Sequence, residues 1–340
     1  MKSPASCANI AIHASQFPEN IRRDLLKSLR EWRMNHKFHY DSIKQTRKWL
    51  ALHQRYSPTR NDADCQKIYE RAFESAAGEI KSKNVHVIGL GCGGGQKDTR
   101  LLKLLKGQGR EVFYTPCDVS TAMVLMARNT ALAVLPEEKC FPVVCDLATV
   151  GNLVNVVGSA RCADRTPQRG VPTNVPRIIT FFGMIPNFEP QEILPKLASL
   201  VRPKDSLLFS ANLAPGRDYA GGIREVLPQY DNKLTRDWLM TFLLDLGIEG
   251  RDGELRFGIE NGRFGLKRIV ASFRFRRKSG VEIEDEMFKF KTGDTIRLFF
   301  SYRYTLELVL TVLGRYKLDV FDQWVTKSEQ EGVFLCSKCG

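Results

Sequence analysis

The N-terminal part of the chain carries a helical pattern of apolar positions. Between residues 18 and 35, apolar side chains recur at three- and four-residue spacing, at Ile21, Leu25, Leu29 and Trp32, with basic residues between them. This periodicity predicts an amphipathic helix. A polar and basic stretch follows to residue 60. A second helix is predicted over residues 61–80, capped by Asn61 or Asp62.

From residue 84 the pattern changes to short apolar segments that alternate with helical ones. Strands are predicted at residues 85–90, 111–115, 143–144, 177–182 and 206–210, and helices at residues 99–105, 121–134 and 191–200. Such alternation is typical of an open, mostly parallel sheet in an α/β fold. Ligands of such sheets bind beyond the carboxyl ends of the strands. Residues 160–176, rich in Pro, Arg and Thr, are predicted to form a loop before the fourth strand.

The pattern changes again after Pro215. A helix is predicted at residues 234–246, strands at 269–276, 282–290 and 295–304, a helix at 306–313 and a last strand at 333–336. Alternating apolar and basic residues in the first of these strands indicate a half-exposed antiparallel strand. We therefore predict two parts. Residues 10–62 with 216–298 form an α+β substrate-binding subdomain, and residues 63–215 with 299–340 form the cofactor-binding α/β domain.

Composition adds a charge imbalance to this picture. The 340 residues include 51 Lys and Arg against 38 Asp and Glu, a net charge of +13, with ordinary globular fractions of hydrophobic and charged residues. Such an excess favours an acidic partner such as nucleic acid. Residues 21–60 and 263–278 alone carry net charges of +8 and +7. Both stretches fall in the predicted substrate-binding subdomain, where solvated faces of one helix and one strand are the simpler interpretation.

Targeting signals and cysteine spacing indicate which cellular compartment and which metal sites the sequence allows. The N-terminus has no apolar run long enough for a signal peptide, and no stretch approaches the ~20 apolar residues of a membrane-spanning helix. The nine cysteines are scattered, and the close pair Cys336 and Cys339 lacks the further ligands of a metal site. We expect a cytoplasmic monomer with reduced thiols, no metal and no membrane contact.

The strongest local motif is a strand that runs into glycines, Val87-Ile-Gly-Leu-Gly-Cys-Gly-Gly-Gly95. Glycine permits positive φ and lets the backbone approach a cofactor closely. Asp118, 24 residues after Gly94, ends the second strand, where an acid can bind both hydroxyls of a ribose. Two cofactors fit these features. The dinucleotide spacing G-x-G-x-x-G is satisfied, and a site for S-adenosylmethionine (SAM) uses the same strand, turn and acid.

The loop after the fourth predicted strand distinguishes a SAM site from a dinucleotide site. It reads Phe181-Phe-Gly-Met-Ile-Pro-Asn-Phe-Glu-Pro190 and places a polar residue, Asn187, among apolar ones at the mouth of the sheet. Such a residue is well placed to hold a substrate amine, and SAM enzymes commonly have a polar loop here beside the methyl donor. A dehydrogenase that uses NAD would need a catalytic His or Lys constellation, which the late part of the chain lacks.

These motifs resemble those of the SAM-dependent Nα-methyltransferases that trimethylate histidine on the way to ergothioneine. Some departures are similar to a fungal branch that methylates dimethylallyltryptophan. The matching segments are Tyr56-Ser-Pro-Thr-Arg60, the glycine turn with Lys97 and Thr99-Arg-Leu-Leu102, the Asn187 loop, and Ser301-Tyr-Arg-Tyr-Thr305. They follow the family's order over about three quarters of the chain. The resemblance implies a class I SAM-methyltransferase fold, Rossmann-like, with a second α+β subdomain.

The resemblance also implies roles for individual residues. The residues expected to line the SAM pocket are Tyr56, Gly91, Gly93, Lys97, Asp118, Asp146 and Gly183. Asn187 would hold the substrate's amino or carboxylate group, and Tyr40 would lie near the amine, so these two are the expected catalytic residues. Tyr230 would bind a carboxylate, and Ser301 would contact the substrate. The ring of Tyr56 would face the sulfonium as a cation–π partner.

Two departures from the family concern the substrate. Two residues before Ser301, where the family has a glutamate that reads the imidazole, this chain has Phe299, which cannot accept an N–H hydrogen bond. The family's Gly-Ser-x-Leu-Phe segment is replaced by Thr46-Arg-Lys-Trp49. We therefore predict N-methylation of the amino group of an amino acid or an amino-acid-derived small molecule other than histidine. A histidine Nα-methyltransferase, a nucleic-acid methyltransferase and a non-catalytic ligand-binding member stay open as alternatives.

Overall fold

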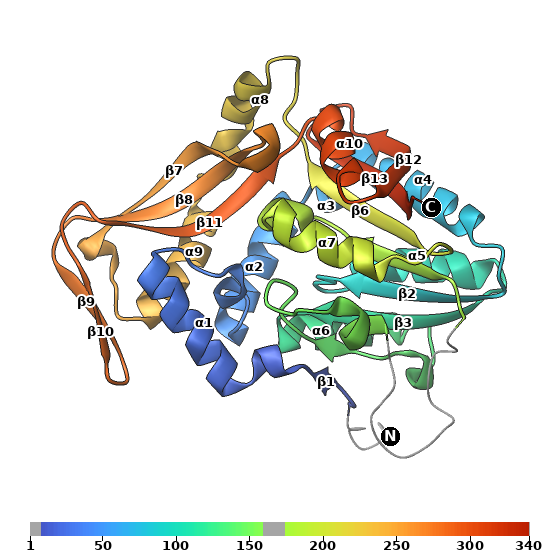
Figure 1. Cartoon of the computed structure of the whole chain (residues 1–340), viewed down its shortest axis with the longest axis horizontal. Coiled ribbons are helices and arrows are strands. Elements are labelled where there is room, and N and C mark those ends of the chain that lie inside the picture. The colour runs from blue at the N-terminus through green and yellow to red at the C-terminus, as the bar shows by residue number, and fades with distance from the viewer. Residues whose placement is uncertain (1–7, 159–173, 340) are drawn as a thin grey trace.

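The computed structural model describes residues 8–158 and 174–339, and its central layer is an eight-stranded sheet (Figure 1). The strand order is β1-β4-β3-β2-β5-β6-β13-β12. The strands are β1 (Ala11–Ile12), β2 (Asn84–Leu90), β3 (Glu111–Asp118), β4 (Val143–Val144), β5 (Arg177–Phe181), β6 (Ser206–Asn212), β12 (Leu318–Val325) and β13 (Glu331–Lys338). The first six run parallel, whereas β13 is antiparallel to both β6 and β12. The order reverses between β2 and β5, where doubly wound folds bind ligands.

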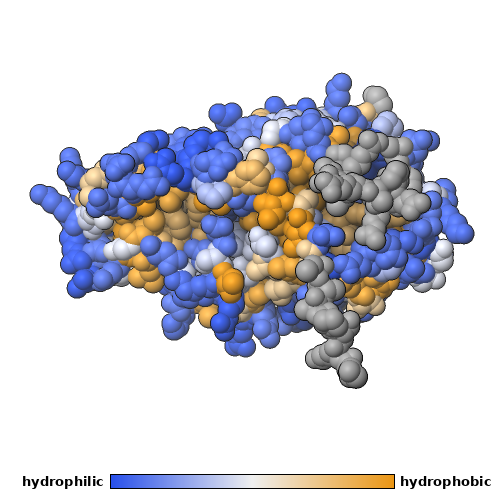
Figure 2. Space-filling model, turned by 90° about the horizontal axis from the view of Figure 1, so that it is seen from below, coloured by the Kyte–Doolittle hydropathy of each residue, from blue (hydrophilic) through white to orange (hydrophobic). Residues whose placement is uncertain are grey.

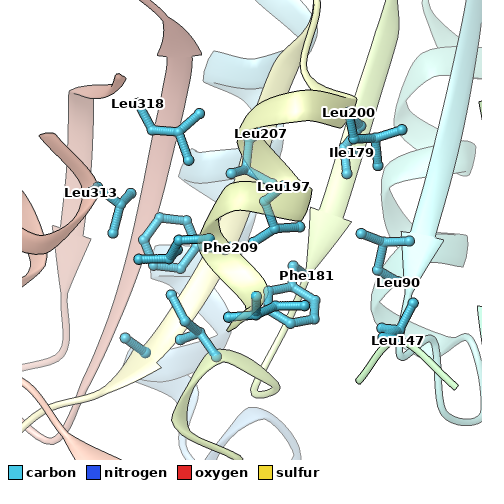
Figure 3. Packing of buried hydrophobic residues seen from close by; sticks show 14 of the residues in the cluster. Leu90, Leu147, Ile179, Phe181, Leu197, Leu200, Leu207, Phe209, Leu313 and Leu318 are labelled. Atoms are coloured by element: carbon cyan, nitrogen blue, oxygen red, sulfur yellow. The ribbon is translucent and has the colours of Figure 1, made fainter. Parts of the chain in front are cut away.

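Helices cover both faces of this sheet. They are α4 (Ala63–Glu79), α5 (Gln96–Gly107), α6 (Thr121–Ala131), α7 (Pro190–Leu200) and α10 (Leu306–Gly314). The helices α4 and α5 share a core with Val85 and Val87 of β2. On the opposite face, α7 and α10 pack on the alternate residues of the strands, and Figure 3 shows Leu197 of α7 beside Phe181 and Phe209. Because both faces are buried, the strands read as continuous apolar runs.

A second, smaller sheet lies beside the first. It consists of β11 (Thr295–Arg303), β8 (Lys267–Phe275) and β7 (Gly253–Asn261), all antiparallel, and a hairpin of β9 (Ser279–Ile283) and β10 (Glu286–Phe290) extends from it (Figure 1). The helices α1 (Pro18–Glu31), α2 (Ile43–Tyr56), α8 (Tyr219–Val226) and α9 (Lys233–Asp245) belong to this part of the molecule. Its core joins Leu29 of α1 and Trp238 of α9 to Phe273 and Phe299 of the sheet.

The structure differs from the sequence predictions at several elements. The polar stretch before residue 60 contains α2, which begins with a capping box between Ser42 and Gln45, and the short α3 (Pro58–Asn61). The strand predicted at 282–290 is part of the hairpin β9–β10, and β12 was not predicted. The predicted boundary between residues 298 and 299 divides β11, because that strand continues in the smaller sheet to Arg303. The loop predicted at 160–176 lies almost wholly outside the described residues.

Ion pairs account for part of the basic excess. Arg22 and Arg30 of α1 pair with Glu284 and Glu286 near the hairpin, each at 2.6 Å, so one predicted basic stretch meets acids of the same subdomain. Seen from below, hydrophilic residues cover most of the surface, with hydrophobic residues between them (Figure 2). Within residues 8–158 and 174–339, no helix is long and apolar enough to cross a membrane.

Candidate active site

The turn that leaves β2 is shaped by glycines. Gly91, Gly93 and Gly95 have φ of +61°, +52° and +77°, values that side-chain-bearing residues rarely adopt. A Cβ at Gly91 would lie 2.5 Å from Cγ of Met184, so a side chain there would collide with the loop after β5. The chain then enters α5. The predicted turn is therefore formed, and its backbone lines a cavity at the switch point of the sheet.

Asp118 ends β3 and holds this turn. Its Oδ2 accepts a hydrogen bond from the Gly93 N–H and its Oδ1 accepts one from the Ser120 N–H, both at 3.0 Å. Burial raises the pKa of Asp118, and the backbone hydrogen bonds oppose that rise. The carboxylate borders the cavity with further lone pairs available for a diol. Its place at the end of the second strand of the α/β unit fits a ribose.

Asp146 lies after β4, at the same edge of the sheet. Its backbone N–H donates to Ser15 Oγ at 3.0 Å, and its Oδ2 lies 3.6 Å from Lys37 Nζ. Lys37 in turn contacts Asp24 Oδ2 at 2.5 Å, and all three charged side chains are buried. This arrangement fastens the N-terminal segment to the rim of the cavity.

Another buried acid, Asp98, was not predicted from the sequence. It lies on the first turn of α5 beneath the glycine turn, where its Oδ2 accepts from Tyr114 and its Oδ1 from Thr180, both at 2.7 Å. Burial raises the pKa of Asp98, and the two hydroxyl groups lower it. A Cβ at Gly89 would lie 2.1 Å from its Oδ2, which explains the first glycine of the motif. Asp98 thus joins the start of α5 to β3 and β5 by hydrogen bonds and packs against Gly89 of β2.

One cavity of about 650 Å³ connects these features. The predicted site residues that line it are Tyr40, Gly91, Gly93, Lys97, Asp118, Asp146, Gly183 and Asn187. Four other predicted residues, Tyr56, Tyr230, Phe299 and Ser301, are not among its lining residues. The volume is in the middle of the range for ligand pockets, about 300–1,000 Å³, so it can hold a nucleoside-containing molecule together with a smaller one.

Asn187 and Tyr40 face the cavity from different elements. Asn187 ends the short helix η5 (Ile185–Asn187), and its side-chain amide makes no hydrogen bond to any described residue. Tyr40 packs edge-on against Trp49 and at 5.5 Å from the ring of Trp238. Burial, and then the charge of Asp118, raise the pKa of Tyr40, so its hydroxyl stays protonated. The amide and the hydroxyl are therefore neutral hydrogen-bonding groups in an aromatic surrounding.

Arg297 and Phe300 are the β11 residues that line the cavity, whereas Phe299 is not among its lining residues. The pairing of β11 with β8 shifts between Arg297 and Phe299, which marks a bulge that changes the side chains facing the cavity. Phe299 is buried, stacked on His36 at 5.1 Å and packed near Trp238. It forms a layer behind the lining of the cavity.

Tyr230 and Ser301 lie together in a polar cluster of their own. The Tyr230 hydroxyl donates to Ser301 Oγ at 3.1 Å and accepts from Arg303 Nη2 at 2.9 Å, and Asn212 Nδ2 lies 3.3 Å from Ser301 Oγ. The predicted pair is thus brought together, but its hydrogen-bonding groups are engaged with each other. Tyr56, at the end of α2, is 50% exposed and outside the cavity lining, contrary to its expected position against the sulfonium.

The lining residues suit SAM and do not suggest a metal. A buried carboxylate at a ribose position, a glycine cradle that a Cβ would fill, and a lysine at the cavity wall match the diol, the close backbone approach and the carboxylate of SAM. Among the residues that the structure describes, no three His, Cys, Asp or Glu side chains are grouped to hold a metal ion.

Comparisons with known proteins agree with this arrangement. Residues 21–219 match the family described as histidine-specific methyltransferase, SAM-dependent. The N-methyltransferase imqF of Aspergillus flavus is 23% identical over 286 residues, which cover 82% of this chain and 73% of that protein.

Two solved methyltransferases are among the structures with weak similarity to this chain. Magnesium protoporphyrin IX methyltransferase from Synechocystis, crystallised with S-adenosylhomocysteine (SAH), is 11% identical over 89% of this chain and 98% of that one, with a TM-score of 0.47. The amino pentose methyltransferase CalS10 from Micromonospora echinaspora, with bound SAM, is 12% identical over 86% and 96%, with a TM-score of 0.38. The family match confirms SAM as the cofactor in place of NAD, and the mostly parallel central sheet covered by helices agrees with the predicted class I fold. The chain belongs to the SAM-dependent histidine-specific methyltransferase family and is a SAM-dependent N-methyltransferase.

Proposed function

We propose that this enzyme transfers the methyl group of SAM to the amino group of a small amino-acid-derived molecule other than histidine. The observation that carries the proposal is the single cavity that joins the glycine turn and Asp118 to Asn187, Tyr40 and Phe300. A methyl donor at the turn and an amine at Asn187 would therefore share one water-depleted space. Methyl transfer is an in-line displacement, so this positioning supplies much of the catalysis.

Different residues of the chain would bind the different parts of SAM. Bound SAM supplies an electrophilic methyl group on a sulfonium. Asp118 would accept hydrogen bonds from the ribose hydroxyls, and Asp146 would contact the adenine end. The backbone at Gly91 and Gly93 would approach the cofactor closely because no Cβ intervenes. Lys97 would attract the carboxylate of the methionine part.

The amine must be neutral before it can attack. The half-buried position of Asn187 and the surrounding rings of Tyr40, Trp49 and Phe300 would desolvate an amine, which lowers its pKa and favours the unprotonated form. The Asn187 side-chain oxygen accepts a hydrogen bond from the amine and directs its lone pair. Tyr40 remains a neutral hydroxyl and adds no charge to this region.

The substrate end of the cavity argues for a molecule other than histidine. Two β11 residues, Arg297 and Phe300, line it, and the guanidinium carbons of Arg268 and Arg297 lie 5.0 and 5.3 Å from the centre of the Phe300 ring. Arg268 also pairs with Glu189 at 2.6 Å. Phe300 cannot accept an imidazole N–H. An apolar or aromatic amine with an anionic group fits such a wall better than a polar ring does.

A product screen tests the proposal. Amino acids, dipeptides and indole amines are incubated with methyl-labelled SAM, histidine and total RNA being included as rival substrates, and products are analysed by mass spectrometry. We expect the label on the nitrogen of an amino-acid-derived amine. The Asn187→Ala variant should lose turnover on that substrate. Transfer to RNA alone, or to histidine alone, would contradict the proposal.

A further inference from the structure

Lys97 has an unusual surrounding for a cofactor-facing lysine. It lies on the first turn of α5 and lines the cavity. Its Nζ donates to the Tyr69 hydroxyl at 2.9 Å and lies 4.5 and 5.6 Å from the ring centroids of Tyr69 and Phe182. No other hydrogen-bond partner of this ammonium occurs among the described residues, so two of its three N–H bonds are available to a ligand.

Tyr69 connects this ammonium to a buried acid from a distant part of the chain. Its hydroxyl donates to Glu331 Oε1 at 2.5 Å, and Cys65 Sγ donates to Glu331 Oε2 at 3.5 Å. Tyr69 and Cys65 are on α4 and fully buried, whereas Glu331 is the first residue of β13. Burial lowers the pKa of Lys97, and Glu331 raises it. Tyr69 is kept neutral because burial and Glu331 raise its pKa.

The sheet order indicates which end of the cofactor meets Lys97. Asp118 ends β3 and Asp146 follows β4, so the adenosine extends from β2 toward β4. The methionine part then extends to the opposite side, toward β5. Lys97 packs over Phe182, the residue directly after β5, and therefore lies at the methionine end. The anionic group at that end is a carboxylate.

We propose that Tyr69 and Glu331 are positioning residues, which hold the Lys97 ammonium so that it binds the carboxylate of SAM. This inference rests on the placement of the cofactor in the proposed function. Glu331 lies beyond residues 21–219, the span of the family match, so this support of Lys97 would come from β13, the last strand along the chain. The Tyr69 hydroxyl donates to Glu331 and accepts from Lys97, so hydrogen bonds link the two charges while the carboxylate stays outside the cavity lining.

The test compares two ligands by isothermal titration calorimetry. SAH carries the carboxylate, whereas 5′-methylthioadenosine shares the adenosine but lacks it. Tyr69→Phe keeps the ring and removes the hydroxyl, and Glu331→Gln keeps the shape and removes the charge. Each should weaken SAH about tenfold and leave the affinity for methylthioadenosine within about twofold. Lys97→Met should show the full loss, and adding Tyr69→Phe to it should cause no further loss.

A matched control separates positioning from general stability. Tyr219→Phe removes a partly buried hydroxyl that bonds the Arg303 carbonyl and the Lys267 N–H, away from the cavity lining. It should lower the melting temperature without changing either affinity. Equal losses of both ligands in Tyr69→Phe and Glu331→Gln, or no loss of SAH, would overturn the inference.

The pH dependence gives a second readout. SAH affinity should fall as the pH rises through the pKa of Lys97, because the ammonium loses its charge. In Glu331→Gln the midpoint of that fall should move to lower pH, since the carboxylate that raises the pKa of Lys97 is gone. An unchanged midpoint would contradict the inference. If the wild-type protein binds neither SAH nor methylthioadenosine, the cofactor placement itself is wrong.

Discussion

Replacing Asp118 with asparagine should weaken cofactor binding while the protein stays folded. The carboxylate accepts the N–H groups of Gly93 and Ser120, both at 3.0 Å, and borders the cavity. Asparagine offers one acceptor oxygen instead of two. Either a ribose hydroxyl or a backbone N–H therefore loses its partner. A hydrogen bond to a charged group contributes about 1.5–3 kcal/mol, which corresponds to about 10- to 150-fold weaker SAH binding.

The effect on folding should be smaller. One backbone N–H that loses its acceptor destabilises the protein by about 1–3 kcal/mol. Because burial disfavours the Asp118 charge, as its raised pKa indicates, removing that charge offsets part of this loss. Thermal unfolding of Asp118→Asn should therefore stay cooperative, with a modest decrease in melting temperature.

Calorimetric titration with SAH measures the affinity, and Ser120→Ala provides the control. Ser120 caps α6 through a 3.4 Å hydrogen bond from the Met123 N–H and does not line the cavity. Its loss should destabilise the fold by about 1 kcal/mol and leave SAH affinity unchanged. If folded Asp118→Asn bound SAH as tightly as the wild type, the assignment of Asp118 to the ribose would be refuted.

Three further changes follow from the site. Asn187→Ala should reduce turnover at least about tenfold, the loss of one positioned hydrogen bond, with SAH affinity unchanged; equal kcat in steady-state kinetics would argue against its role. Phe299→Glu should lower the melting temperature and create no histidine turnover, because the carboxylate would be buried between His36 and Trp238; new histidine methylation would show that this position reads the substrate. Burial lowers the pKa of His39 to about 4. Between pH 6.5 and 4 the unfolded chain therefore binds a proton on His39 that the folded chain does not bind. The contribution of His39 to the free energy of unfolding should then fall by about 3 kcal/mol as the pH drops from 6.5 to 4. Denaturant titrations should show a flatter profile for His39→Gln than for the wild type, and the remaining slope comes partly from His36, His53 and His86, whose pKa values burial also lowers.

The sequence was sufficient for the cofactor half of the molecule because its signals are local. The glycines Gly91 and Gly93, the acid at the end of the next strand and the alternating apolar segments can each be recognised from a short stretch of sequence. The helix α2 was missed, although Ser42 and Gln45 form a capping box. The polar composition of this stretch gives only a weak helical pattern. Packing against the rest of the fold stabilises the helix, because tertiary contacts can override weak local propensity.

The substrate half depended on long-range contacts that a single sequence does not display. The bulge between Arg297 and Phe299 exchanges which residue of β11 faces the cavity, and no composition signal marks it. Asp98 is an ordinary helical acid in the sequence and becomes a brace only when Tyr114 and Thr180 meet it. The expected roles of Tyr230 and Ser301 in substrate binding remain predictions.

The most direct test of the account is the identity of the atom that receives the methyl group. Purified enzyme is incubated with methyl-labelled SAM and a set of amino-acid-derived amines, and tandem mass spectrometry locates the label. The account predicts transfer to the amino nitrogen of one such amine, slower transfer in Asp118→Asn at limiting SAM and in Asn187→Ala, and little or no methylated histidine. Methylation of histidine at the highest rate, or of nucleic acid alone, would contradict it.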